Sequence, residues 1–140
     1  MADDPARPSR IGQATVRDLA TAGVELAIAR VRLSSRHARA LIAAPAMEAA
    51  QLDPRQAALV ERVAYLIPRV SARLPWRADC LVQAIAAERW LARHGVATKL
   101  TLGVPRDKPA DFEAHAWLSA GTRIVTGGDI SGYVPLNLPR

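Results

Sequence analysis

One cysteine occurs in the sequence, and its position suggests chemistry. Cys80 lies at the beginning of a strongly helical stretch, residues 79–94. A helix N-terminus leaves backbone N–H groups unpaired and carries a partial positive charge, and both favour a thiolate. Arg77 adds a positive charge nearby in the sequence. Because a lone cysteine is more often a buried apolar residue, Cys80 alone fits either a nucleophile or a core position.

Two further residues could form a catalytic set with Cys80. His115 lies in AHAW, where strand alternation points its side chain to the face opposite Ala114 and Ala116. Asp129 follows fourteen residues later, in TGGDISGY. In a cysteine peptidase these residue types act as the nucleophile, the base that becomes an acid, and the group that orients the imidazole. A satisfied, half-buried histidine and a turn aspartate are the simpler interpretations.

The tryptophans near this set have two interpretations. The indole N–H of Trp76 is a candidate second oxyanion donor beside the backbone N–H of Cys80. Alternatively, Trp76 and Trp117 are apolar walls of a substrate pocket. Phe112 and Tyr133 could shape a substrate groove or simply pack.

Other chemistries find little support in the sequence. His94 falls in a last helical turn, where a histidine complements the helix dipole, and His37 lies in an Arg-rich stretch. One cysteine and three scattered histidines do not form a metal-ligand spacing, so no metal is expected. The pair Gly127-Gly128 is too short for a phosphate loop, so no cofactor is expected.

The elements that must position these residues change character along the chain. Helices are predicted over residues 9–33, with an apolar stripe that includes Val16, Val24 and Val31, and over 37–44 and 79–94, the last followed by Gly95. Another helix begins at Asp53 with Pro54 at N1, and Pro68 should kink or end it. Strands are predicted over 97–104, 113–119 and 122–126, with Ala120-Gly121 as the hairpin turn and a turn-rich tail.

Length and composition limit the organisation. The 140 residues, half of them hydrophobic, predict a single domain over 1–140, with a helical subregion at 1–75 and a catalytic core at 76–140. The arginines behind the net charge of +6 are spread over several helices, which indicates solvated faces, or alternatively a surface for an acidic protein or peptide partner, rather than a nucleic-acid site. The absence of a secretory h-region or an 18-residue apolar run, together with the single cysteine, indicates a cytoplasmic protein without a membrane span.

The order of these motifs resembles a known family. A cysteine that opens a helix, a histidine on a strand and an aspartate after the next strand resemble the transglutaminase-like branch of the papain-type fold. More narrowly, the segments DCLVQAIAAERWLARHG, TKLTLGV and FEAHAW resemble the lasso peptide B2 family of leader peptidases. The resemblance is close over roughly the last 65 residues and loose over the helical first half.

This resemblance implies a fold, an activity and partners. The fold would be α+β, a papain/transglutaminase-like core with an N-terminal helical half and a small C-terminal antiparallel sheet. The activity would be removal of the leader from a ribosomally synthesised lasso peptide precursor, with Cys80, His115 and Asp129 matching the catalytic residues and Asp111 or Glu113 as the fallback for Asp129. The partners would be the precursor leader peptide, a separate leader-recognition protein of the B1 type and possibly a macrolactam cyclase. Alternatives are a non-catalytic binding or scaffold module and a thiol acyltransferase.

Overall fold

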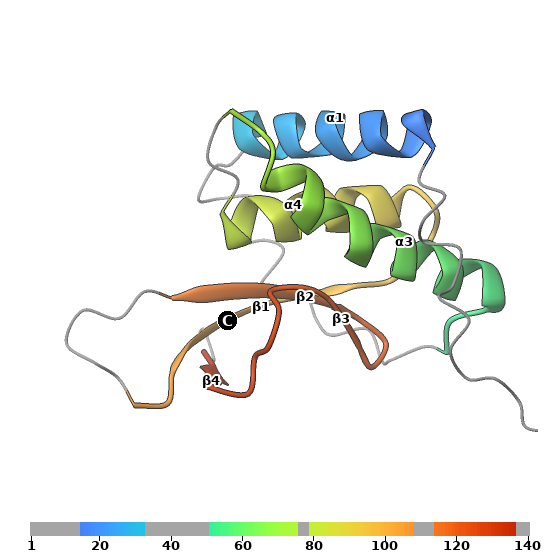
Figure 1. Ribbon diagram of the computed structural model, residues 1–140. Helices are drawn as coiled ribbons and strands as arrows, with labels where there is room; N and C mark the ends of the chain where they lie inside the picture. Colours follow the sequence, from blue (N-terminus) through green and yellow to red (C-terminus); the bar gives the residue numbers. More distant parts are fainter. Residues whose placement is uncertain (1–14, 33–50, 76–78, 108–113, 137–140) are drawn as a thin grey trace, which may run out of the picture.

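Helices cover one face of an antiparallel sheet in the part of the chain that the structure describes (Figure 1). The structure is a computed structural model, and it describes residues 15–32, 51–75, 79–107 and 114–136. The helices are α1 (Val16–Arg32), α3 (Pro54–Ser71) and α4 (Cys80–Ala92). The strands are β1 (Lys99–Pro105), β2 (His115–Ala120), β3 (Arg123–Thr126) and β4 (Tyr133–Pro135). The predicted α+β arrangement is confirmed; the helical piece predicted at 37–44 lies outside the described residues.

Local capping determines where α3 begins. The Asp53 carboxylate accepts a hydrogen bond from the Gln56 N–H at 2.8 Å, and the Gln56 side chain accepts from the Asp53 N–H at 3.1 Å. This capping box, with Pro54 at the first helical position, confirms the predicted beginning. Of the two expectations at Pro68, a kink or an end, the helix does not end there, because α3 continues to Ser71. Proline removes only one helical hydrogen bond there, and the residues beside it, Ile67 and Ser71, are buried.

Helix α4 is bounded by an aspartate cap and a glycine. The Asp79 carboxylate accepts from the Val82 N–H at 3.1 Å. At the other end Gly95 has a φ of 73°, its N–H donates to the Ala92 carbonyl, and the Val96 N–H donates to the Leu91 carbonyl, both at 3.0 Å. This Schellman pattern needs the left-handed conformation that glycine adopts without strain, as the sequence predicted.

Helix α1 turns a different face to the core from the one that its apolar stripe predicts. Val16, Val24 and Val31 are 84%, 56% and 87% exposed. The buried positions on α1 are Ala22, Glu25, Leu26 and Ala29. The core side of α1 is therefore made of small residues, one leucine and a carboxylate, while the valine stripe lies on the outside.

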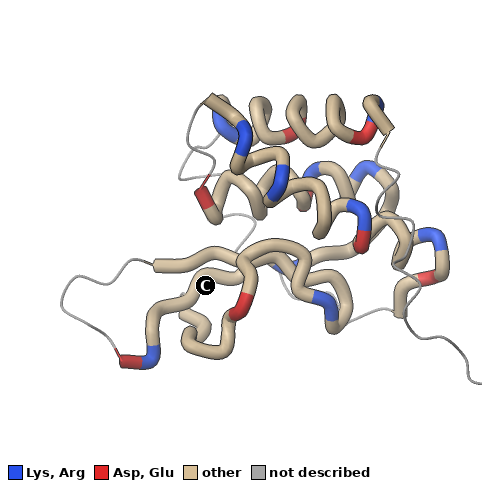
Figure 2. The backbone as a smooth tube through the Cα atoms, viewed as in Figure 1, with Lys and Arg blue, Asp and Glu red and all other residues tan. Residues whose placement is uncertain are grey.

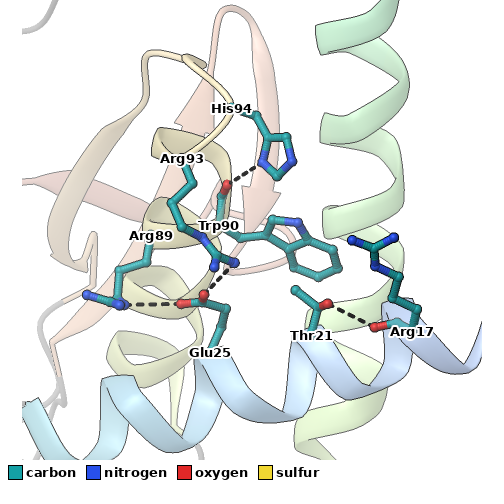
Figure 3. A network of polar contacts seen from close by, with 7 residues as sticks. All are labelled: Arg17, Thr21, Glu25, Arg89, Trp90, Arg93 and His94. Carbon is teal, nitrogen blue, oxygen red and sulfur yellow. Dashed lines mark hydrogen bonds and ion pairs between the residues drawn. The ribbon is translucent and has the colours of Figure 1, made fainter.

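Ion pairs to α4 explain why a glutamate is buried on α1. Glu25 is 1% exposed, and its Oε2 lies 3.1 Å from the Arg89 Nε, while its Oε1 lies 2.6 Å from an Nη of Arg93 (Figure 3). Two guanidinium groups thus compensate the charge of one carboxylate. We call these three residues the Glu25 cluster; it joins α1 to the C-terminal half of α4.

The sheet has the order β3-β2-β1-β4, and every neighbouring pair is antiparallel. The predicted strands agree with β1, β2 and β3 to within about two residues. Ala120 pairs with Arg123, so the hairpin turn consists of Gly121, with a φ of 58°, and Thr122. The prediction of Ala120-Gly121 as the turn was one residue early.

Strand β4 lies in the tail that the sequence indicated to be turn-rich, and no strand was predicted there. Its three residues pair with the end of β1, with Val134 opposite Val104. The Tyr133 N–H donates to the Ile130 carbonyl at 3.0 Å, and Pro135 has no N–H. Neither residue therefore offers a free backbone donor to another strand, which protects this edge against unwanted pairing.

The core lies between the sheet and the helices, with α4 at its centre. Helix α4 contacts both other helices and packs on β2. Ala116, Leu118 and Ala120 of β2 belong to this core, so the alternate residues of that strand face away from the helices. Lysines and arginines are distributed over all three helices rather than gathered on one (Figure 2). No helix among the described residues is long and apolar enough to cross a membrane.

Candidate active site

Cys80 is the first residue of α4, as the sequence predicted. Its thiol is free and half-buried, and it packs against the hydrophobic core. Asp79 caps the same helix end. The neighbouring residues 76–78, including the oxyanion candidate Trp76 and the nearby Arg77, lie outside the described part of the chain.

His115 is the first residue of β2 and lies opposite Gly103 of β1. Because Ala116 is buried in the core, the imidazole lies on the sheet face away from the helices, as the alternation predicted. Its Nε2 is 2.7 Å from the carbonyl oxygen of Gly127. The Tyr133 ring centroid is 4.7 Å away, and that of Trp117 is 6.2 Å away.

Trp117 shares the face of His115 and fits between two glycines. A Cβ on Gly103 would come within 2.5 Å of the indole Cζ3, and a Cβ on Gly127 within 2.4 Å of the Trp117 Cβ. Only glycine at both positions leaves room for this side chain, which is 4% exposed. Trp117 is therefore a tightly packed support for the surroundings of His115.

Asp129 lies in the loop that leaves β3. The register pairs Leu118 with Thr126, so a straight continuation of β3 would place residue 129 opposite His115. Instead Gly127 and Gly128, with φ of 106° and 66°, turn the chain. The Asp129 carboxylate accepts from the Ser131 N–H at 2.9 Å, and this hydrogen bond is the main reason that its pKa is lowered below the usual 3.8.

The structure brings some of the predicted residues together and leaves others apart. Helix α4 and strand β2 begin at the same end of the molecule, on the left in Figure 1, so Cys80 and His115 share that end. Among the described residues, no hydrogen bond joins His115 to Cys80 or to Asp129. The thiol belongs to the helical layer, and the imidazole to the opposite sheet face.

The remaining candidate site residues from the sequence either have a hydrogen-bond partner elsewhere or lie outside the residues that the structure describes. The Nδ1 of His94 is 3.0 Å from the Trp90 carbonyl, at the end of α4 (Figure 3). Asp111, Phe112 and Glu113 are outside the described residues. Within the described part of the chain, no group of three or more potential metal ligands gathers.

Two contacts of His115 were missed by sequence reasoning. The Gly127 carbonyl is a backbone group, so no side-chain motif marks it. Its only signal is a Gly-Gly pair directly after a strand. Tyr133 contacts the imidazole because β4 returns beside β1, and β4 was not predicted.

The fold and these positions define a class of protein. A cysteine begins the central helix α4, and α4 packs on an antiparallel sheet whose strand β2 begins with a histidine. The chain belongs to the transglutaminase-like superfamily, because the family model with that description matches residues 20–137. This superfamily generally comprises cysteine peptidases and transferases. Searches of curated proteins and of solved structures found no significant match.

Proposed function

We propose that the protein is a cysteine peptidase that removes the leader from a ribosomally synthesised lasso peptide precursor. The observation that carries the proposal is that the chain's only cysteine begins the central helix, which packs on the strand that begins with His115. Membership of the transglutaminase-like superfamily supports cysteine chemistry. The resemblance of DCLVQAIAAERWLARHG and FEAHAW to the B2 family supports the substrate.

In this proposal three residues have separate roles. The Cys80 Sγ attacks the scissile carbonyl carbon, and His115 transfers the thiol proton to the leaving amine as the C–N bond breaks. Water then attacks the thioester carbonyl carbon while His115 accepts its proton, and the C–S bond breaks as His115 returns that proton to the Cys80 Sγ. Asp129 orients the imidazole. Cys80 and His115 must come within hydrogen-bond reach for these steps, and such contacts often tighten only when substrate binds.

The proposal includes partner proteins. The precursor leader would be presented by a separate leader-recognition protein of the B1 type, and the product passed to a macrolactam cyclase. The outer face of α1 supports a docking role, since Val16, Val24 and Val31 are exposed beside the exposed arginines Arg17 and Arg30. Neighbouring genes for a short precursor, a small recognition protein and an asparagine-synthetase-like cyclase would support this assembly.

Substitution of the nucleophile tests the activity. Cys80→Ala and Cys80→Ser should lower the rate of precursor cleavage at least about a thousandfold in a reconstituted reaction with the recognition protein, because the covalent step is lost. The side chain is only half-buried, so we expect the far-UV circular dichroism spectrum to be unchanged. Cleavage is followed by mass spectrometry of the released leader.

A control variant shows whether the loss of cleavage is specific to Cys80 or follows from any substitution in the protein. Lys99→Ala changes an exposed residue at the beginning of β1 and should cleave at the wild-type rate. If Cys80→Ala still cleaves the precursor, the peptidase assignment is wrong. His115→Gln should also be inactive but folded; an unfolded variant would instead indicate that His115 is a structural residue.

One observation favours a second candidate, a non-catalytic binding or scaffold module. His115 is satisfied by the Gly127 carbonyl on the face away from the helices, and no hydrogen bond joins it to Cys80 among the described residues. A module of this kind would bind the precursor without cleaving it, and its Cys80 would react with iodoacetamide no faster than a free thiol. Acyl transfer by the same residues would differ only in that an amine, rather than water, intercepts the thioester.

A further inference from the structure

The contact between His115 and Gly127 determines which ring nitrogen carries the proton. A carbonyl oxygen can only accept, so the Nε2 that lies 2.7 Å from it must donate. A neutral imidazole has one N–H, and its other nitrogen is an acceptor. The hydrogen bond to Gly127 therefore leaves Nδ1 as the nitrogen that can take up a proton.

Only glycine can present its carbonyl at this place. Residue 127 has a φ of 106°, which side-chain-bearing residues rarely adopt. A Cβ there would also lie 2.4 Å from the Cβ of Trp117 and 3.2 Å from the carbonyl oxygen of Ala116. The loop thus passes directly against the backbone of β2, and this close passage brings the carbonyl to the His115 ring.

The rest of the loop is closed by Asp129. Its carboxylate accepts from the Ser131 N–H at 2.9 Å, an Asx turn, and the next turn is closed by the hydrogen bond from the Tyr133 N–H to the Ile130 carbonyl at 3.0 Å. The chain then enters β4, where the Tyr133 ring lies 4.7 Å from the imidazole. The same loop therefore supplies two contacts of His115, one at each of its ends.

We propose that the Gly127 carbonyl holds His115 in the Nε2–H tautomer, and that Asp129 is a positioning residue that acts through the turn it closes rather than by touching the imidazole. The catalytic meaning of this arrangement rests on the proposed function, because a peptidase would use the Nδ1 atom as its base. The tautomer itself does not depend on that function. Asp129 is ionised at neutral pH, so its contribution to the turn is lost only as the pH falls below the usual 3.8 through its lowered pKa.

The tautomer can be measured without substrate. Long-range ¹H–¹⁵N correlation spectra of ¹⁵N-histidine-labelled full-length protein, recorded where the rings are neutral, distinguish Nε2–H from Nδ1–H. His94 is an internal reference with the opposite pattern, since its Nδ1 must donate to the Trp90 carbonyl at 3.0 Å. The sequence has three histidines, so His37→Gln and His94→Gln assign the signals. We expect His115 to be Nε2–H; an Nδ1–H or mixed signal in the wild-type protein overturns the proposal.

Two substitutions at Asp129 distinguish the effect of losing the turn hydrogen bond from the effect of losing the negative charge. Asp129→Asn keeps an oxygen that can accept from the Ser131 N–H, whereas Asp129→Ala removes it. We expect the Nε2–H signature to persist in Asp129→Asn and to become mixed in Asp129→Ala. In the cleavage assay Asp129→Ala should lower kcat about tenfold, and Asp129→Asn should recover most of that loss.

A direct catalytic carboxylate would behave differently. Loss of its charge in Asp129→Asn should then lower kcat on the order of 10⁴-fold, and the His115 signal should change in both variants. That result would overturn the proposal that Asp129 acts through the turn that it closes. Because the spectra need no activity, the tautomer assignment stands if Cys80→Ala still cleaves the precursor, and the peptidase assignment stands if the tautomer is found to be Nδ1–H.

Discussion

Within the described part of the chain, the His115 imidazole is held by a backbone carbonyl and by aromatic rings rather than by a charged side chain. The Gly127 carbonyl fixes one ring nitrogen, and the Tyr133 ring lies 4.7 Å from the ring centroid. Trp117 lies further along the same face and occupies the space above Gly103. The position of the imidazole therefore depends on two glycines that have no functional groups of their own.

We predict that Gly103→Ala destabilises the protein and disturbs His115. The new Cβ would lie 2.5 Å and 2.6 Å from two ring atoms of Trp117 and 3.0 Å from the Val134 carbonyl oxygen. The indole is buried, so it cannot move away without shifting its neighbours. We expect a loss of about 1–3 kcal/mol in the free energy of unfolding, measured by urea denaturation.

Gly23 in α1 is the matched control for this substitution. A Cβ there meets no atom within 4 Å, and alanine favours a helix interior over glycine. Gly23→Ala should stabilise the protein by about 0.5–1 kcal/mol. If Gly103→Ala is as stable as the wild type, Trp117 is not confined by Gly103 and the tight packing argued for this face is incorrect.

At the residue scale, the sequence predicted which face His115 occupies but not what holds it. The alternation of AHAW is a local pattern, and the burial of Ala116 confirms it. The partner of the imidazole is a backbone carbonyl in a loop twelve residues later, positioned by a β3 that ends at Thr126. The sequence places Asp129 near His115; in the structure Gly127 and Gly128 turn the chain after β3, and the Asp129 carboxylate accepts from the Ser131 N–H.

At the element scale, the Glu25 cluster is the main polar link between α1 and α4. Glu25 is almost fully buried, whereas Arg89 and Arg93 are 24% and 54% exposed at their side chains. Removal of one arginine leaves the other to compensate the carboxylate. Removal of both leaves a buried charge without a partner.

We therefore predict that substitutions in the Glu25 cluster are not additive. Arg89→Ala and Arg93→Ala should each lower the free energy of unfolding by about 1 kcal/mol. The double variant should lose about 3–5 kcal/mol, more than the sum, measured by urea denaturation.

An exposed ion pair serves as the control for the Glu25 cluster. Arg62 lies 3.7 Å from Asp18 and joins α3 to α1, but its side chain is 52% exposed. Arg62→Ala should cost less than about 1 kcal/mol. Additive losses in the Arg89 and Arg93 variants would contradict the shared role of the two arginines.

The elements that the sequence predicted well have local signals at their ends. The Asp53 and Asp79 side chains each cap a helix by accepting a hydrogen bond from the backbone N–H three residues later, and Gly95 follows the end of α4. The buried face of α1 has no local signal in the sequence, because Glu25 is paired with Arg89, 64 residues away, and no local pattern contains that partner. Strand β4 was missed because three residues ending in proline carry almost no periodicity.

At the scale of the whole molecule, the layers separate the outer face of α1 from the sheet face that carries His115. The sheet carries His115 on the face away from the helices, and α1 is the helix farthest from the sheet (Figure 1). A protein bound to the outer face of α1 would therefore leave the His115 face uncovered. A recognition protein docked there could present a peptide without blocking that face.

The outer face of α1 combines exposed valines with exposed arginines, which suits the proposed docking of an acidic, apolar segment. Val16, Val24 and Val31 are exposed, and no exposed acidic side chain is described on α1 beside Arg17 and Arg30. A complementary partner segment would bury valines and pair carboxylates with the arginines. Arg36 and Arg39, which extend the basic pattern in the sequence, lie outside the described residues.

We predict that two carboxylates introduced on this face weaken the complex without unfolding the protein. The double variant Val24→Glu with Val31→Glu should raise the Kd for the recognition protein at least about tenfold, measured by isothermal titration calorimetry, because two carboxylates replace buried apolar contacts. Its free energy of unfolding should change by less than about 0.5 kcal/mol, since both residues are exposed. Lys99→Glu, which places a carboxylate on the sheet instead, is the control and should bind as the wild type does. An unchanged Kd in the double variant would contradict docking on α1, and a large loss of stability would show that the chain itself covers these valines.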